Sequence, residues 1–310
     1  MQRIAIIDLG TNTFNLLIVE YAKNKKPKVI FKNKIPAKLG AGGFTEKKIK
    51  PKAFQRGLDA LHIHKDSINE FGVFSVHAFG TSALRDASNS NKFLKAVLKE
   101  TGIKVNIISG EKEAELIYNG VSKAIDIGPK PQLIMDIGGG STEFIIADRK
   151  QILWKHSFDL GISRIWESLA PSDPLHERDI KALGKVLDIG LKLLFSALKQ
   201  FPVEGLIGSS GSFESLAKLI LVLKGREYDF AKNTCYSFKL NELQMIHNML
   251  IKSTKKERKK MKGLVKYRLD TIPLASVFVM YIISRLKIKE MRLSTYALRE
   301  GVMSEMINMA

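Results

Sequence analysis

The most regular feature of the hydrophobic pattern is a pair of apolar runs separated by a short polar stretch that contains glycine. This feature occurs in Ile4–Val19 and again in Leu133–Ala147. Short apolar runs bounded by glycine and small polar residues are typical of two strands joined by a tight turn. The pattern therefore predicts two β-hairpins, about 128 residues apart in the sequence.

The two predicted hairpins correspond position by position. When they are aligned without gaps, the matching positions are Asp8 with Asp136, Gly10 with Gly138, Thr13 with Ser141, and Asn15 with Glu143. A repeat of this spacing is too long for a solenoid and suits two similar lobes. Two such hairpins that face each other would enclose a ligand in the cleft between the lobes, where binding sites often lie.

The rest of the pattern alternates strands with helices, which favours a mixed α/β architecture. The first half contains a basic turn at 23–28, a strand at 29–31, a flexible connection at 37–46, and then helix 51–71, strand 73–79, helix 91–101, strand 103–108 and helix 111–125. The second half contains strand 151–158, helices 162–169 and 177–200, a helical stretch at 240–284, an edge strand at 292–294 and a closing helix at 298–309. The linker Gly128–Pro131 divides the chain into domains 1–126 and 127–297, and helix 298–310 is a candidate to rejoin the first domain.

The charge balance adds a preference for polyanions. The 310 residues include 50 Lys and Arg against 31 Asp and Glu, which gives a net charge of +19. Such a surface attracts nucleic acid, inorganic polyphosphate and anionic membranes alike. Nine basic residues and one acid lie between Lys252 and Arg268. The simplest interpretation of this run is a solvated helix face, and the alternative is a track for a long anionic chain.

The chain has one cysteine, Cys235, so it has no intrachain disulfide and suits a reducing cytosol. We expect this cysteine to be a small buried residue. No apolar signal segment opens the sequence, and the longest apolar tract, 271–284, is too short to span a bilayer. These features predict a cytoplasmic protein without a membrane partner.

The turn of the second hairpin has the composition of a phosphate-binding loop. Three consecutive glycines, 138–140, allow left-handed or strained backbone angles and let N–H groups approach a ligand closely. Asp136 and Glu143 flank this turn and could hold a divalent metal. A glycine-rich hairpin with solvated acids is the simpler interpretation. A third small-residue loop, Gly208–Gly211, precedes a helix and suits either an anion or a plain helix cap.

Hydrolysis of a phosphoanhydride also needs a carboxylate that orients or deprotonates the attacking water. Glu113 is our candidate for this base, because it lies in the first turn of a predicted helix, where the helix dipole favours its ionised form. An acid at this position also serves simply to compensate the dipole. Arg85, which follows a Gly-Thr-Ser turn, is the candidate cation for a terminal phosphate.

Six motifs together resemble the exopolyphosphatase and guanosine pentaphosphate phosphohydrolase family, and they occur in order over essentially the whole chain. They are Asp8-Leu-Gly-Thr-Asn-Thr, Thr81-Ser-Ala-Leu-Arg-Asp-Ala87, Ile108-Ser-Gly-Glu-Lys-Glu-Ala-Glu-Leu116, Asp136-Ile-Gly-Gly-Gly-Ser-Thr-Glu143, Gly208-Ser-Ser-Gly211 and Leu298-Arg-Glu-Gly301. The resemblance is to the short, two-domain members. It implies an α/β fold of two ribonuclease-H-like domains of the actin, sugar kinase and Hsp70 superfamily, with an interdomain cleft.

The resemblance also implies roles for particular residues. It makes Glu113 and Glu143 catalytic, and it assigns Asp8, Asp136 and Glu143 to a magnesium ion or another divalent cation such as manganese. The implied phosphate-binding residues are Gly10, Thr11, Asn12, Thr13, Arg85, Gly138, Gly139, Gly140, Ser141, Gly208, Ser209, Ser210 and Gly211. Two positions depart from the family pattern: Asn15 replaces a basic residue that is frequent in relatives, and Glu115 replaces an arginine. Both departures lower the positive charge expected near the site.

The function that the resemblance implies is metal-dependent release of orthophosphate from the end of inorganic polyphosphate. A guanosine pentaphosphate (pppGpp) 5′-phosphohydrolase and a non-catalytic sensor of polyphosphate or an alarmone are the alternatives that stay open, and an actin-like ATPase or kinase is a more distant one. We expect no specific nucleic-acid partner. The sequence does not specify the oligomeric state, and a homodimer is the hypothesis that we retain.

Overall fold

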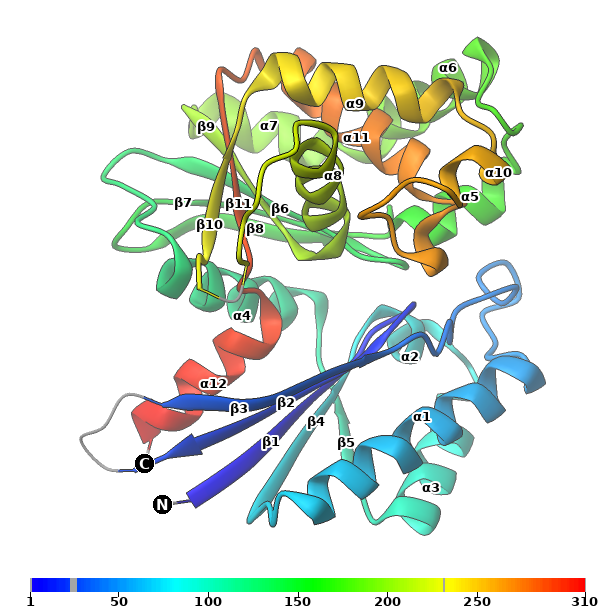
Figure 1. Ribbon diagram of the computed structural model, residues 1–310, viewed down its shortest axis with the longest axis vertical. Coiled ribbons are helices and arrows are strands. Elements are labelled where there is room, and N and C mark those ends of the chain that lie inside the picture. Colours follow the sequence, from blue (N-terminus) through cyan, green and yellow to red (C-terminus); the bar gives the residue numbers. More distant parts are fainter. Residues whose placement is uncertain (1, 23–26, 231, 310) are drawn as a thin grey trace.

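The chain forms two lobes, each built on one β-sheet, with two helices lying between them (Figure 1). The computed structural model describes residues 2–22, 27–230 and 232–309. The helices between the sheets are α4 (Gly110–Ala124) and α12 (Leu298–Met309). α12 packs against α4 and against β1 and β2 of the first sheet.

The first sheet joins an antiparallel meander to two parallel strands. In its described part the order is β3-β2-β1-β4-β5, formed by β1 (Gln2–Leu9), β2 (Phe14–Tyr21), β3 (Lys28–Ile35), β4 (Ser75–Gly80) and β5 (Val105–Ile107). β1 pairs antiparallel with β2 and parallel with β4, so its carboxyl end opens at the same edge as the end of β4.

The second sheet repeats this order and adds one strand. It runs β10-β11-β9-β6-β7-β8, formed by β6 (Gln132–Ile137), β7 (Thr142–Ala147), β8 (Ile152–Phe158), β9 (Gly205–Ser209), β10 (Cys235–Phe238) and β11 (Glu290–Ser294). β6 pairs antiparallel with β7 and parallel with β9, as β1 pairs with β2 and β4. This duplicated order confirms the prediction of two ribonuclease-H-like lobes.

The strand register confirms the repeat that the sequence predicted. In the first hairpin Asp8 pairs with Asn15, and in the second Asp136 pairs with Glu143. Each aspartate is therefore the second-last residue of its strand and occupies the same position in its lobe.

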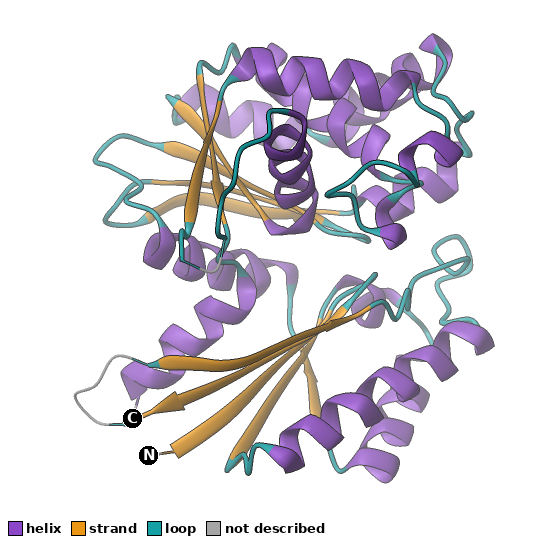
Figure 2. Cartoon of the chain, viewed as in Figure 1, coloured by secondary structure: helices purple, strands orange, loops and turns teal. Residues whose placement is uncertain are grey.

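The helices cover the sheets and create three apolar cores. α1 (Pro51–Glu70) and α3 (Ser90–Thr101) lie on one face of the first sheet (Figure 2). The second lobe carries α5 (Ile162–Leu169), α6 (Glu177–Gly190), α7 (Lys192–Gln200), α8 (Ser210–Leu223), α9 (Leu240–Lys252), α10 (Lys255–Arg258) and α11 (Ile272–Leu286). The third core lies between the sheets, where residues of both contact α4 and α12. The short helix α2 (Ser82–Asp86) follows β4.

Some predicted elements differ from the structure. The stretch 240–284 is not one helical region, because a capping box at Thr254 and Glu257 starts a new short helix and Gly263 adopts a left-handed φ of 89°. A 3-10 turn, η1 (Lys266–Arg268), follows before α11. Similarly, 177–200 divides into α6 and α7 at Leu191.

The end of the chain also differs from the prediction. β11 is an interior strand between β9 and β10, not an edge strand, and β10 was not predicted. The strand predicted at 29–31 extends over β3, and Ala37 and Leu39 in the following connection are buried. Cys235 is half-buried rather than buried. The basic turn predicted at 23–28 lies largely outside the described residues, as does residue 310 of the closing helix. None of the described helices combines the length and apolar character needed to cross a membrane.

Candidate active site

The turns of the two hairpins face one cleft between the lobes. Asp8, Asn15 and the turn 10–13 line it from the first lobe, and residues 136–141 and Glu143 line it from the second. The cavity has a volume of about 160 Å³. The structure therefore brings Asp8 and Asp136 together at a shared gap, as the repeat predicted.

Asp8 is held by its own hairpin. Asn15 Nδ2 donates to Asp8 Oδ2 over 2.9 Å, and the turn is closed by a hydrogen bond from Gly10 N to the carbonyl oxygen of Thr13. Burial raises the pKa of Asp8 above its usual value. Asn15 thus supplies a neutral donor where relatives were expected to carry a cation, and its buried Oδ1 has no partner among the described residues.

The acids of the second hairpin are held by serines. Ser209 Oγ donates to Asp136 Oδ2 over 2.7 Å, and Ser157 Oγ donates to Glu143 Oε1 over 2.6 Å. Both carboxylates are buried. Burial raises the pKa of Asp136 to about 6, and burial together with the charge of Asp136 raises the pKa of Glu143 to about 7. The cleft therefore concentrates negative charge that a bound cation would relieve.

The glycine turn of the second hairpin is required by close packing rather than by unusual backbone angles. Gly138, Gly139 and Gly140 do not have positive φ angles, contrary to one of the expected reasons for them. A Cβ atom on Gly139 would lie 2.8 Å from Asn12 Nδ2, and one on Gly140 would lie 2.4 Å from Ser82 Oγ. The glycines let the second hairpin approach the first lobe, because a side chain at Gly139 or Gly140 would overlap Asn12 or Ser82.

Glu113 lies in the first turn of α4, where Ser109 caps the helix. Its carboxylate is buried, and Arg85 Nη1 donates to Glu113 Oε2 over 3.1 Å and to the carbonyl oxygen of Ile108 over 3.0 Å. Burial and the charge of Glu143 raise the pKa of Glu113 well above its usual value, and Arg85 opposes this shift. Arg85 itself does not line the cleft, so its predicted contact with phosphate stays a prediction.

The third predicted loop divides into two parts. Gly208 and Ser209 belong to β9, where Gly208 faces the ring of Phe213 and Ser209 holds Asp136. Ser210 and Gly211 begin α8 and line the cleft. Only the second part of this loop therefore offers backbone N–H groups to a ligand.

Three cations line the cleft that were not among the predicted site residues: Lys34 in β3, Arg268 in η1 and Arg299 in α12. Desolvation and the nearby charge of Arg268 lower the pKa of Lys34 to about 8. Arg268 belongs to the basic run and Arg299 to the last quoted motif, so these two had a signal in the sequence. Lys34 had none, because it reaches the cleft only through the pairing of β3 with β2.

The second departure from the family pattern, Glu115, lies outside the cleft. Its carboxylate forms ion pairs with Lys112 at 2.9 Å and with Lys155 at 3.1 Å. The expected loss of positive charge at the site therefore concerns Asn15 alone, and Lys34, Arg268 and Arg299 supply cations there.

The donors at the hairpin ends suit a hard divalent cation. Within the described ranges, no group of three or more His, Cys, Asp or Glu side chains is arranged to hold a metal ion. Asp8, Asp136 and Glu143 therefore do not form a complete metal site by themselves. Magnesium commonly takes one or two carboxylates and completes its shell with water and substrate phosphates. Asp136 is buried and Asp8 is partly buried, and burial together with the charge of Asp8 raises the pKa of Asp136, so this pair fits that mode.

Known proteins are similar to this chain in sequence and in fold. The model of the Ppx/GppA phosphatase family matches residues 17–310. The chain is 28% identical over 298 residues to the guanosine-5'-triphosphate,3'-diphosphate pyrophosphatase of Aeromonas hydrophila, across 96% of this chain and 58% of that protein. It is 34% identical over 280 residues to the bifunctional 3-dehydroquinate synthase/phosphatase of Fusobacterium nucleatum, across 86% of this chain and 41% of that protein. The chain thus spans about half the length of these curated relatives.

Solved structures agree. An exopolyphosphatase from Cytophaga hutchinsonii matches with a TM-score of 0.97 and 35% identity, covering 100% of this chain and 99% of that one. The Ppx/GppA enzyme of Aquifex aeolicus matches in fold, with a TM-score of 0.79 and 24% identity over 98% of this chain and 99% of that one. As its motifs predicted, the chain belongs to the Ppx/GppA phosphatase family.

Proposed function

We propose that this protein hydrolyses the terminal phosphate of a linear phosphoanhydride, with inorganic polyphosphate as its substrate. The observation that carries the proposal is one cleft that combines three cations, the backbone of two hairpin turns and the buried base candidate Glu113. Oriented N–H groups and cations bind phosphate oxygens, and a carboxylate beside them can act on water.

In the proposed reaction, water attacks the terminal phosphorus and Glu113 accepts the proton that the water loses. A base is most effective when its pKa lies near the working pH, and burial raises the pKa of Glu113 in that direction. Arg85 would fix the carboxylate through its contact with Oε2 and keep the base pointed toward the cleft. The leaving group is the shortened phosphate chain.

A divalent cation is part of the proposal. Asp8 and Asp136 would hold it, and it would neutralise phosphate oxygens during hydrolysis. Arg268, Lys34 and Arg299 would share the remaining charge of the substrate with the N–H groups of Ser210 and Gly211.

Guanosine pentaphosphate is the second candidate substrate, because the Aeromonas relative is named for that activity. The Cytophaga structure, which matches nearly the whole of both chains, is named an exopolyphosphatase and supports the first. Orthophosphate release would be measured side by side with polyphosphates of several lengths and with guanosine pentaphosphate, with magnesium and after its removal by a chelator. Faster turnover of guanosine pentaphosphate than of polyphosphate would make the nucleotide the substrate. Tight binding of either compound without release of orthophosphate, with any divalent metal, would favour a sensor.

The base is tested by Glu113→Gln, which keeps the shape of the side chain and removes its proton acceptor. We expect phosphate release to fall by at least about 100-fold, the usual scale for a general base. Glu115→Gln is the matched control, because Glu115 lies on the same helix, is paired with Lys112 and Lys155, and does not line the cleft. Equal rates for Glu113→Gln and the parent would exclude Glu113 as the base.

A further inference from the structure

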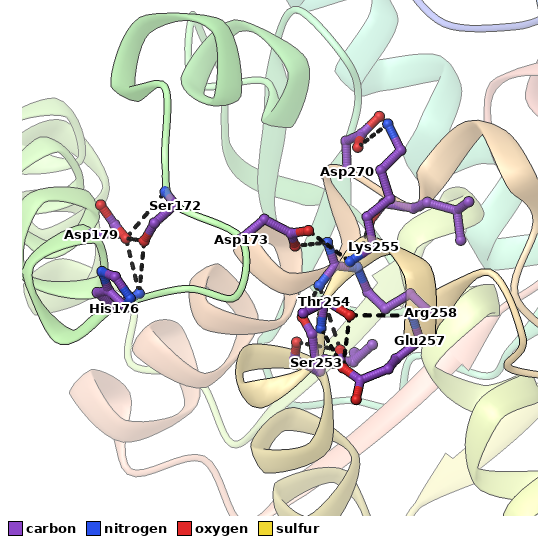
Figure 3. Close-up of polar contacts among 12 residues, drawn as sticks. Ser172, Asp173, His176, Asp179, Ser253, Thr254, Lys255, Glu257, Arg258 and Asp270 are labelled. Atoms are coloured by element: carbon purple, nitrogen blue, oxygen red, sulfur yellow. Dashed lines mark hydrogen bonds and ion pairs between the residues drawn. The ribbon is translucent and has the colours of Figure 1, made fainter.

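One basic residue of the run 252–268 is buried, although a solvated face was the simplest expectation for the run. Arg258, in α10, is 3% exposed, and Figure 3 shows its polar contacts. Its Nε donates to the carbonyl oxygen of Leu269 over 2.7 Å, its Nη2 donates to Asp173 Oδ1 over 2.5 Å, and its Nη1 donates to the carbonyl oxygen of Ser253. A planar guanidinium with three separate acceptors is held in one orientation.

A second contact joins α10 to the segment 269–270. Lys255 Nζ lies 2.7 Å from Asp270 Oδ1, and the backbone N–H of Lys255 donates to Asp173 Oδ2 over 2.7 Å (Figure 3). α10 therefore holds the chain at Leu269 through Arg258 and at Asp270 through Lys255. We call these four residues and Asp173 the α10 anchor.

The residue directly before the anchored segment is Arg268, which lines the cleft. Arg268 Nη1 donates to Ser215 Oγ over 2.9 Å, and its guanidinium covers Gly211, where a Cβ atom would lie 1.5 Å from Nη2. The cation thus lies against the start of α8. Arg268 is the last residue of η1 and is followed directly by Leu269 and Asp270. Its position therefore depends on the path of the backbone at these two residues.

We propose that Arg258 is a positioning residue that sets Arg268 in the cleft and so determines how tightly a polyphosphate chain is bound. The proposal deepens the function proposed above and rests on it. Arg258 acts on binding rather than on the chemical step, because the base candidate Glu113 lies on α4 and is held there by Arg85 of α2, outside the segment that α10 anchors.

This assignment separates Arg258 from its basic neighbours. The side chains of Lys259 and Lys260 are exposed and have no hydrogen-bond or ion-pair partner among the described residues. If the run acted as an external track for the substrate, removing these lysines would weaken binding at least as much as removing the buried arginine. If Arg258 acts through Arg268, the lysines are dispensable for short substrates.

The test uses the full chain and tripolyphosphate as the probe. Binding is measured by calorimetry, and KM and kcat by phosphate release, for Arg258→Met, Arg268→Met, the double variant and the control Lys259→Met. We expect Kd to rise about tenfold in Arg258→Met, the scale of one lost charge-assisted contact, with kcat changed less than about twofold. The double variant should bind no more weakly than Arg268→Met alone. Lys259→Met should match the parent.

An unchanged Kd in Arg258→Met, or additive losses in the double variant, would overturn the inference. If Arg258→Met does not fold, Asp173→Asn replaces it, because Asp173 is partly exposed and the substitution removes the negative charge that pairs with Arg258. The same pattern, with a smaller rise in Kd, is then expected. If the parent binds tripolyphosphate in this Arg258-dependent way and releases no phosphate, the proposed hydrolysis fails and the positioning role stands.

Discussion

His64 couples the first hairpin to the helix that covers it. Its ring, on α1, has no exposed surface, and Nε2 donates to the carbonyl oxygen of Phe14 over 3.3 Å. Nδ1 has no partner among the described residues. Because charging a buried imidazole is costly, burial lowers the pKa of His64 to about 4. This histidine is a neutral structural residue packed against the hairpin that carries Asp8.

The pKa of His64 makes a prediction about stability. The unfolded chain binds a proton to this histidine below about pH 6.5, whereas the folded chain does so only near pH 4, so acidification through this window favours unfolding. From this residue alone we expect a loss of about 2 kcal/mol between about pH 7.5 and pH 5. Urea unfolding of the parent and of His64→Gln at both pH values measures it. The raised pKa values of Asp136 and Glu143 act in the opposite direction, and they cancel in the comparison of the two proteins. An identical pH dependence would contradict the role.

α4 and α12 are packed backbone against backbone. A Cβ atom on Gly301 would lie 1.8 Å from the carbonyl oxygen of Leu116, and one on Gly120 would lie 2.0 Å from that of Ala297. α4 carries Glu113 and Arg299 is on α12, so this contact fixes the distance between the candidate base and a cation of the cleft. Backbone atoms cannot rotate away as a side chain can.

Gly301→Ala should therefore destabilise the protein. We expect the free energy of unfolding to fall by about 1 to 3 kcal/mol, because the added methyl group forces the helices apart. Gly184→Ala is the control: Gly184 is inside α6 with no atom near the added Cβ, and a gain of about 0.5 to 1 kcal/mol is expected. Denaturant unfolding of both variants and of the parent measures these changes in the free energy of unfolding. A Gly301→Ala protein as stable as the parent would mean that the helices can separate without cost.

The elements that the sequence revealed most clearly are those whose signals are local. Both hairpins were predicted in register, because the alternation of apolar runs and turn residues lies within 16 neighbouring positions or fewer. β10 and the interior place of β11 were not predicted, since β11 pairs with β9 and β10, which are distant in sequence. The break in 240–284 depends on one capping box and one left-handed glycine, which interrupt an otherwise helical composition.

The candidate site shows the same division. Asp8, Asp136, Glu113 and Glu143 were predicted from motifs, and the structure places all four in one cleft. Lys34 could not be predicted, because it becomes a cleft residue only when β3 pairs beside β2 and the lobes close. Burial of the acids, and therefore their raised pKa values, is likewise a property of the assembled lobes.

The lobes are joined in two chemically different ways. On one side α4 and α12 share an apolar core with both sheets. The other contact is polar and comes from α5. Ser163 exchanges hydrogen bonds with Asn12 at 2.8 and 3.0 Å, Arg164 pairs with Asp86, and Glu167 accepts hydrogen bonds from two backbone N–H groups at 42–44. An apolar core resists separation throughout, whereas polar contacts exchange readily with water.

We therefore expect the polar contact to set how firmly the cleft is closed while contributing little to folding. In the double variant Asp86→Asn and Glu167→Gln, the free energy of unfolding should change by less than about 1 kcal/mol, as is usual for partly exposed pairs. The KM for polyphosphate should rise several-fold, because α5 also orders Asn12 in the first turn. Small-angle scattering should give a larger radius of gyration than for the parent. Glu204→Gln, which breaks an exposed pair with Lys130, is the control that should leave both quantities unchanged. If the double variant keeps the parent's radius of gyration and KM, the apolar core alone holds the lobes together.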